Sequence, residues 1–330
     1  MRANFATSAR LTRSAIAGLA ACALVATSAT AQETPAAPNG PPGRPGPADP
    51  PGLPGLPGLP PGGSAEGLPP PGMMVKQLTE AQKLVASLPP PQPGVGGPAE
   101  LAPDAPKPSP DPRDLQGGWN HDTPLVFRMQ YDKYGEPVPY NMAGAKVLER
   151  RVLALNQGTP FLNASAICRP PGIQWQHDLN MPFRVFQNDK YVEFVFEEYH
   201  GRWYIVLDAS FAPPPAEKQY MGYSVGHWDG NTLVVETTEM KQGLYLDVDG
   251  TPLSANGKLI SRIRKIDDGQ RRPFLEIETT IVDPTYYDEP WSVVRRFGWN
   301  PASFREYNCE EQIGDPFGDA NAGLVPEPQD

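Results

Sequence analysis

Apolar and polar residues alternate along most of the chain after Trp119, with the period of two that is typical of strands buried on one face. The alternation begins with Leu125, Phe127, Met129 and Tyr131. The pair Asp229-Gly230, between two later strands, predicts a tight hairpin turn. Further strands are expected near residues 182–188, 190–199, 202–208, 222–228, 232–238, 244–248, 258–266, 273–282, 291–299 and 303–309.

About ten strands joined mostly by short loops predict an all-β domain with antiparallel, up-and-down topology. Such a meander either closes into a barrel or folds into a sandwich, and we expect a barrel because closure leaves no exposed strand edge. One helix is expected within the domain, at residues 142–156. There Ala145, Leu148 and Val152 recur at helical spacing and Gly158 follows the end.

The prolines divide the chain into segments. Of 43 prolines, 25 lie between Pro35 and Pro112, and each removes a backbone donor and fixes φ. We therefore expect a disordered spacer at residues 32–113, the barrel domain at 114–315 and a flexible acidic tail at 316–330. Within the spacer, residues 73–88 predict a short amphipathic helix, which docks on the domain, contacts a cell-envelope partner or stays marginally stable.

The first 31 residues have the three parts of a secretory signal peptide: a basic start, an apolar run over Ala15–Ala26 and a small-x-small cleavage site that ends at Ala31. The run is too short to span a bilayer core of about 30 Å. These features predict a periplasmic or secreted protein without a transmembrane segment. The residues before Cys22 resemble a lipobox, so a lipoprotein anchored at Cys22 is the alternative.

Charge and motifs exclude several classes of protein. The formal net charge of −10 and the lack of a basic stripe argue against nucleic acid as a partner. No phosphate-binding loop or dinucleotide fingerprint is present, so we expect no cofactor. His121, His177 and His200 do not have the spacing typical of metal ligands, so we expect no metal site, a site formed by these three histidines being the alternative.

Candidate nucleophiles are few. Cys168 and Cys309 would most simply form a disulfide in an oxidising compartment, two free thiols being the alternative, and neither has a histidine at catalytic spacing. Gly222-x-Ser224-x-Gly226 matches the letters of a nucleophile elbow. That motif requires a strand-turn-helix context, whereas a hairpin is expected here.

One candidate acid/base pair ends the strand expected at residues 190–199. Because side chains alternate, Glu198 and His200 would share a face with Val192, Phe194 and Phe196. A carboxylate that orients an imidazole is suited to general acid/base catalysis. A surface Glu and a His bonded to turn backbone are the alternative.

Candidate ligand-binding residues lie on two other strands. Trp291, Arg295 and Trp299 share one face of strand 291–299, where the arginine either braces the aromatic rings or binds an acidic ligand. Tyr223 and His227 share a face of strand 222–228 and are expected to line the same cavity. A histidine hydrogen-bonded beside the turn is the alternative for His227.

Residues 220–237, YMGYSVGHWDGNTLVVET, resemble the signature of a widespread family of exported bacterial proteins. The resemblance extends over nearly all of residues 114–312 and implies export and a shared fold, but no reaction. His227 stands where the family pattern has Arg, and Asn231 where it has Asp. Four other blocks are similar to the family's: Cys168–Gly172, Phe196–His200, Asp283-Pro284 with Pro290-Trp291, and Glu306–Glu310.

A second resemblance concerns the start of the domain. Gly117-Gly118-Trp119 is similar to the Gly-x-Trp that opens the first strand of lipocalin-like barrels. Together with the meander and Arg295, it implies a calycin-like barrel that holds one ligand in its lumen, with Trp119 beside it.

Three functions follow from these patterns. The first is an exported protein that binds a small apolar or acidic molecule. The second is a periplasmic hydrolase or isomerase that uses Glu198 and His200, with Arg295 stabilising charge. The third is a structural envelope or interaction protein, in which the spacer and residues 73–88 make the contacts.

Overall fold

The computed structural model describes residues 77–97, 101, 104–179, 181–208, 210–269, 272–301, 305–309 and 326–327. All of them belong to one compact unit that begins at Gly72. The expected signal peptide, Cys22, the first part of the spacer and most of the acidic tail lie outside the described residues.

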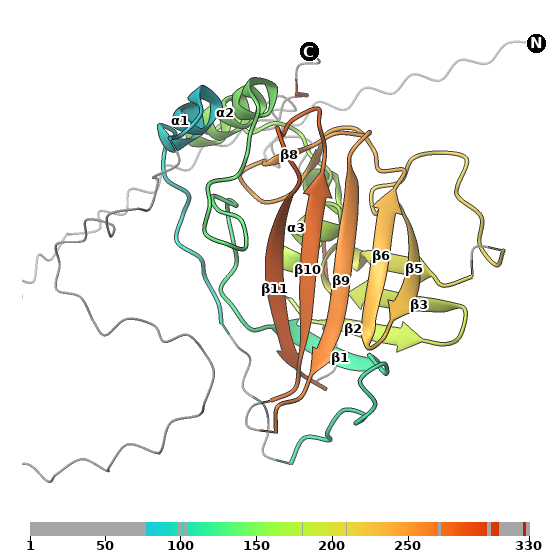
Figure 1. Ribbon diagram of the computed structural model, residues 1–330. Coiled ribbons are helices and arrows are strands. Elements are labelled where there is room, and N and C mark those ends of the chain that lie inside the picture. Colours follow the sequence, from blue (N-terminus) through green and yellow to red (C-terminus); the bar gives the residue numbers. More distant parts are fainter. Residues whose placement is uncertain are drawn as a thin grey trace, which may run out of the picture. The chain divides into compact units, whose positions relative to one another are not determined.

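Nine strands form a closed barrel, in the order β1-β11-β10-β9-β6-β5-β4-β3-β2 (Figure 1). This confirms the all-β barrel, with nine strands in place of the expected ten or so. The strands are β1 Gly117–His121, β2 Phe183–Gln187, β3 Tyr191–Phe196, β4 Arg202–Val206, β5 Tyr223–Asp229, β6 Thr232–Thr238, β9 Lys258–Ile266, β10 Phe274–Val282 and β11 Trp291–Trp299.

The expectation of a purely antiparallel barrel is wrong at one pair. β4 and β5 run parallel, with Ile205 opposite Ser224. Their connection, residues 207–222, contains three consecutive prolines that cannot extend a sheet. Parallel neighbours need a long connection that returns the chain to the same end of the sheet, and this segment supplies it. Elsewhere the β5–β6 hairpin is confirmed, with a two-residue turn at Gly230-Asn231.

Other expected strands differ from the observed ones. The barrel begins at Gly117–His121, and residues 125–130 form no strand. Instead, the backbone N–H of Met129 donates to the buried carboxylate of Asp247 at 2.8 Å. Residues 305–309 are not a strand. The segment expected at 244–248 contributes only β7, Leu244–Tyr245, which pairs with β8, Pro252–Leu253, outside the barrel.

Two helices lie side by side at one end of the barrel (Figure 1). Helix α2, Met142–Asn156, has the expected bounds and is capped by the side chain of Asn141. Helix α1, Glu80–Ala86, begins with a capping box formed by Thr79 and Gln82. Gln82 Nε2 donates to the carbonyl of Pro137 at 3.2 Å, so this short helix docks on the domain.

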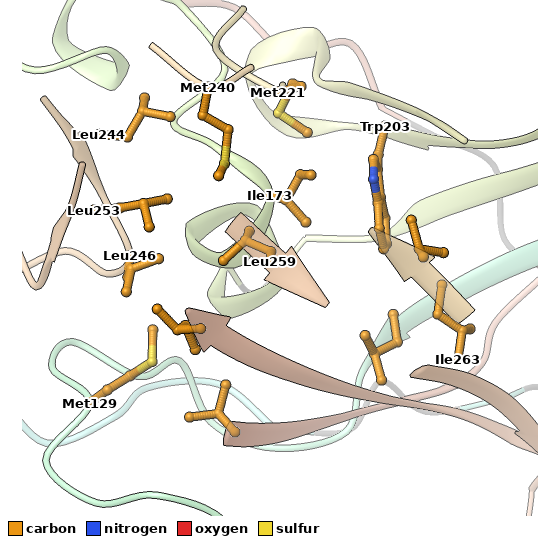
Figure 2. Packing of buried hydrophobic residues seen from close by; sticks show 14 of the residues in the cluster. Met129, Ile173, Trp203, Met221, Met240, Leu244, Leu246, Leu253, Leu259 and Ile263 are labelled. Atoms are coloured by element: carbon orange, nitrogen blue, oxygen red, sulfur yellow. The ribbon is translucent and has the colours of Figure 1, made fainter. Parts of the chain in front are cut away.

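A further helix that the sequence patterns did not predict lies inside the barrel. All six residues of α3, Ile173–Asp178, are buried. The His177 ring contacts inward rings of β3, β4 and β11, namely Phe196, Trp203 and Phe297. Figure 2 shows Ile173 in the middle of the apolar packing, close to Leu259 and Met240. The helix therefore fills part of the interior.

One disulfide joins Cys168 to Cys309, as the cysteine count predicts. It fixes residues 305–309 beside the loop that precedes α3. None of the helices among the described residues combines the length and apolar character needed to cross a bilayer.

Candidate functional site

An open groove of about 600 Å³ lies at the rim of the barrel. Its lining comes from three segments: the loop before α3, the turn that leads into β4, and the end of the proline-rich connection to β5. The lining combines cationic groups with an apolar floor. Its residues are Arg169, Pro170, His200, Arg202, Gln219, Tyr220, Met221 and Gly222.

The turn between β3 and β4 gives this rim its shape. Residues Glu198–His200 form the 3₁₀ turn η2, within which Tyr199 has φ 56° and His200 has φ 51°. Non-glycine residues in this region are strained and often occur at functional sites. The reversal ends the strand at Phe196, so Glu198 and His200 do not continue the inward face of β3. His200 is exposed and faces the groove.

Helix α3 supports this turn from inside the barrel. Gln176 Nε2 donates to the carbonyl of Glu198 at 3.1 Å. A Cβ at Gly201 would lie 2.7 Å from Gln176 Oε1, so the helix and the turn are in close contact. Arg169 and Pro170, just before α3, thus line the groove themselves. The helix that follows them supports the turn that places His200 in the same groove.

Glu198 has an unusual environment for a carboxylate. Burial raises its pKa to about 7, and Glu197 acts in the same direction, while a hydrogen bond with Tyr307 opposes them. The Tyr307 ring also lies against Tyr199 and His200, with ring centroids 5.3 and 6.0 Å apart. A carboxyl group with this pKa exists in both protonation states near neutral pH.

Tyr307 is held in place by its neighbours in the chain. Cys309 is linked to Cys168, and the backbone N–H of Arg305 donates to the buried Glu197 carboxylate at 2.8 Å. The segment 305–309 therefore forms one side of the turn. Tyr307 was absent from the sequence-based site because its neighbourhood depends on the disulfide.

The positive charge of the groove comes mainly from Arg169. Its side chain is exposed and, among the described residues, has no ion pair. Arg202 pairs with Glu193 and keeps 67% of its side chain exposed. Sequence reasoning missed both arginines.

The barrel interior contains a separate polar cluster around Arg295. As expected, Arg295 points inward from β11, and its guanidinium pairs with the fully buried carboxylate of Asp178 on α3. Burial raises the pKa of Asp178, and the Arg295 charge opposes this shift. The arginine thus bonds a charge of its own chain, which fixes α3 inside the barrel.

Two histidines adjoin this pair and are held neutral. Burial lowers the pKa of His177 to about 3, and the positive charge of Arg295 acts in the same direction. Neither ring nitrogen of His177 has a hydrogen-bond partner among the described residues. Burial also lowers the pKa of His121, although the nearby Asp178 opposes the shift. No group of three His, Cys, Asp or Glu side chains in the described parts of the chain is arranged to hold a metal.

The three candidate tryptophans are buried and distributed along the barrel. Trp119 and Trp299 meet edge to face at 5.1 Å, and their indole N–H groups donate to the carbonyls of Leu115 and Pro106. Trp291 lies against Tyr287 at 5.3 Å. None of the three lines the rim groove.

The expected orientation of β5 is wrong. Ser224 and Gly226 point inward, which places Tyr223 and His227 on the outer face. A Cβ at Gly226 would lie 2.7 Å from Ile205, so only glycine fits there. The Ser224 hydroxyl accepts from Trp203 at 2.8 Å and lies 2.7 Å from the Thr237 hydroxyl. It is a buried structural group.

Comparison with protein-family models, curated proteins and solved structures gave no match to this chain.

The buried His177 predicts acid sensitivity. Its folded pKa of about 3 lies below the ordinary value of 6.5, so only the unfolded chain takes up this proton between the two values. The unfolding free energy of the wild type should therefore fall as the pH is lowered from about 6.5 to 4. In His177→Phe this fall should be smaller by roughly 1 kcal/mol per pH unit. Urea unfolding at several pH values measures this slope. His227→Phe, on the outer face, is the control, and equal slopes for His177→Phe and wild type would contradict the prediction.

Proposed function

We propose that this protein is an exported binding protein for a small organic anion, and that the rim groove is its binding site. The observation that carries the proposal is the exposed guanidinium of Arg169 beside Arg202 and His200, above an apolar floor that includes Tyr220 and Met221. Guanidinium groups match carboxylate, sulfonate and phosphate groups in geometry. The floor would contact the apolar body of such a ligand.

The charge of the whole chain makes this groove distinctive. With a formal net charge of −10, the chain as a whole repels anions. A local positive site concentrates anions there and gives selectivity over neutral molecules. The interior is a poorer candidate, because α3 occupies it and Asp178 already pairs with Arg295.

Export is supported by the three-part N-terminal pattern and by the disulfide. Disulfides persist in oxidising compartments such as the periplasm, and Cys168 and Cys309 are paired here.

A second candidate function is acid/base catalysis at the same rim. It is favoured by the raised pKa of Glu198, by the adjacent Tyr307 and by His200 in the groove wall. A hydrolase or isomerase could use a carboxyl group that exchanges protons near neutral pH. Such an enzyme would need Glu198 to reach the substrate, whereas only His200 of this turn lines the groove.

The binding proposal is tested with 8-anilinonaphthalene-1-sulfonate, an aromatic sulfonate whose fluorescence rises on binding. Arg169→Glu should weaken its affinity by about tenfold, because reversing a nearby charge changes the binding free energy by roughly 1–2 kcal/mol. Lys146→Glu, an exposed change on α2, is the matched control for net charge. If both variants bind like wild type, or lose affinity equally, the groove is not the anion site.

Export is tested by expressing the full chain in a Gram-negative host. The mature protein should begin at Gln32, be recovered from the periplasm or the medium, and contain the Cys168–Cys309 disulfide, as measured by mass spectrometry. Cys22→Ser should leave its processing unchanged. Recovery in the membrane fraction with an acyl group on Cys22 would instead establish the lipoprotein form.

The catalytic alternative is tested with a panel of chromogenic esters. If Glu198 acts as a base, turnover should rise with pH through about 7. Glu198→Gln and His200→Gln should each abolish turnover while the sulfonate probe still binds. Full turnover in His200→Gln would rule out the pair as the catalytic groups.

A further inference from the structure

Arg151 of α2 holds the carboxylate of Glu327, a residue near the far end of the sequence. Its guanidinium makes two hydrogen bonds to Glu327, Nε to Oε1 at 2.8 Å and Nη2 to Oε2 at 2.9 Å. Arg150 Nη2 adds a third at 3.2 Å. Bidentate arginine–carboxylate pairs of this kind are among the strongest and most directional hydrogen-bonded contacts in proteins. Glu327 thus has the position of a bound ligand.

The Arg151 side chain is also held by groups other than the Glu327 carboxylate. Its guanidinium carbon lies 3.9 Å from the centre of the Tyr245 ring, and Nη1 donates to the carbonyl of Gly250 at 2.9 Å. Gly250 has φ 98°, and a Cβ there would lie 2.7 Å from Arg151 Cδ. The Tyr245 ring in turn stacks with Trp175 of α3, with ring centroids 5.8 Å apart.

This arrangement requires an anion. Only 5% of the Arg151 side chain is exposed, and 14% of the Glu327 side chain. A largely buried guanidinium without a counter-charge is costly, and its other polar contact here is one neutral carbonyl. A solvated surface arginine would not need the contact with the Tyr245 ring or the close approach of Gly250. Glu327 lies far along the chain from α2, so the pairing is not a by-product of local structure.

We propose that Arg150 and Arg151, backed by Tyr245, form a recognition site for an acidic peptide segment, which the chain's own Glu327 occupies and which the same segment of a second copy can enter. The sequence around Glu327 is Pro-Glu-Pro. Prolines on both sides limit the freedom that a segment loses when it binds. Every copy of the chain carries this segment, so self-association by exchange of the tail needs no other partner. This site is separate from the rim groove and does not depend on the function proposed for it.

The test uses the full chain and a fluorescent peptide with the sequence of residues 321–330. In the wild type, Glu327 competes as an attached ligand with an effective concentration on the order of millimolar. Glu327→Gln removes the competing carboxylate, so this variant should bind the peptide at least tenfold more tightly than wild type, as measured by fluorescence anisotropy. A peptide with Gln in place of Glu327 should bind neither protein.

Two controls make the result decisive. Glu149→Gln, a neighbouring acid on α2, should bind the peptide as weakly as wild type. The double variant Arg151→Gln/Glu327→Gln should no longer bind the peptide. If this double variant folds poorly, the comparison of the Glu and Gln peptides on Glu327→Gln still tests the proposal. The proposal is overturned if Glu327→Gln binds no better than wild type, or if the Gln peptide binds as tightly as the Glu peptide.

Discussion

The Asp178–Arg295 pair inside the barrel is the contact on which the rest of the arrangement depends. Eight strands give a barrel that its own side chains just fill, and nine leave more space. Helix α3 occupies that space, but it brings a carboxylate into an apolar interior. A buried charge is tolerated only with a well-placed partner, and β11 supplies it. The helix can stay inside because this charge is neutralised there.

The same helix determines where a ligand can bind. Because α3 enters the barrel directly after Pro170, the preceding Arg169 is left at the rim. Gln176 then bonds the backbone of Glu198 from within, which supports the turn that presents His200. The position of α3 inside the barrel thus both fills the interior and supports the turn at the rim. This differs from a hollow barrel, in which the lumen itself would be the site.

Much of the framework could be predicted from local patterns. The bounds of α2, β9 and β11 follow from apolar periodicity, and the β5–β6 turn follows from its Asp-Gly pair. The inward face of β11, including Arg295, was also predictable because bulky apolar residues mark it. In β5 the same reasoning fails, since the crowded interior beside Ile205 and Trp203 accepts only the small Ser224 and Gly226.

The candidate site was less predictable, because it depends on contacts between distant segments. A six-residue helix is too short for its periodicity to be recognised, so α3 left no clear signal. Glu198 and His200 were found as residues, but the strand ends at Phe196, and the positive φ values of Tyr199 and His200 belong to the turn that follows it. Tyr307 joins them only because Cys309 is bonded to Cys168.

The seam of the barrel also bears on how the chain reaches this structure. Trp119 of β1 pairs with Trp299 of β11, partners that lie about 180 residues apart, and such distant pairings make folding slow. A polypeptide delivered with its N-terminus first cannot complete the ring until its last strand has arrived. Until then β1 and its neighbours present unpaired edges that invite aggregation. A chaperone that covers strand edges would therefore be most useful to this protein during the interval before β11 is available for pairing.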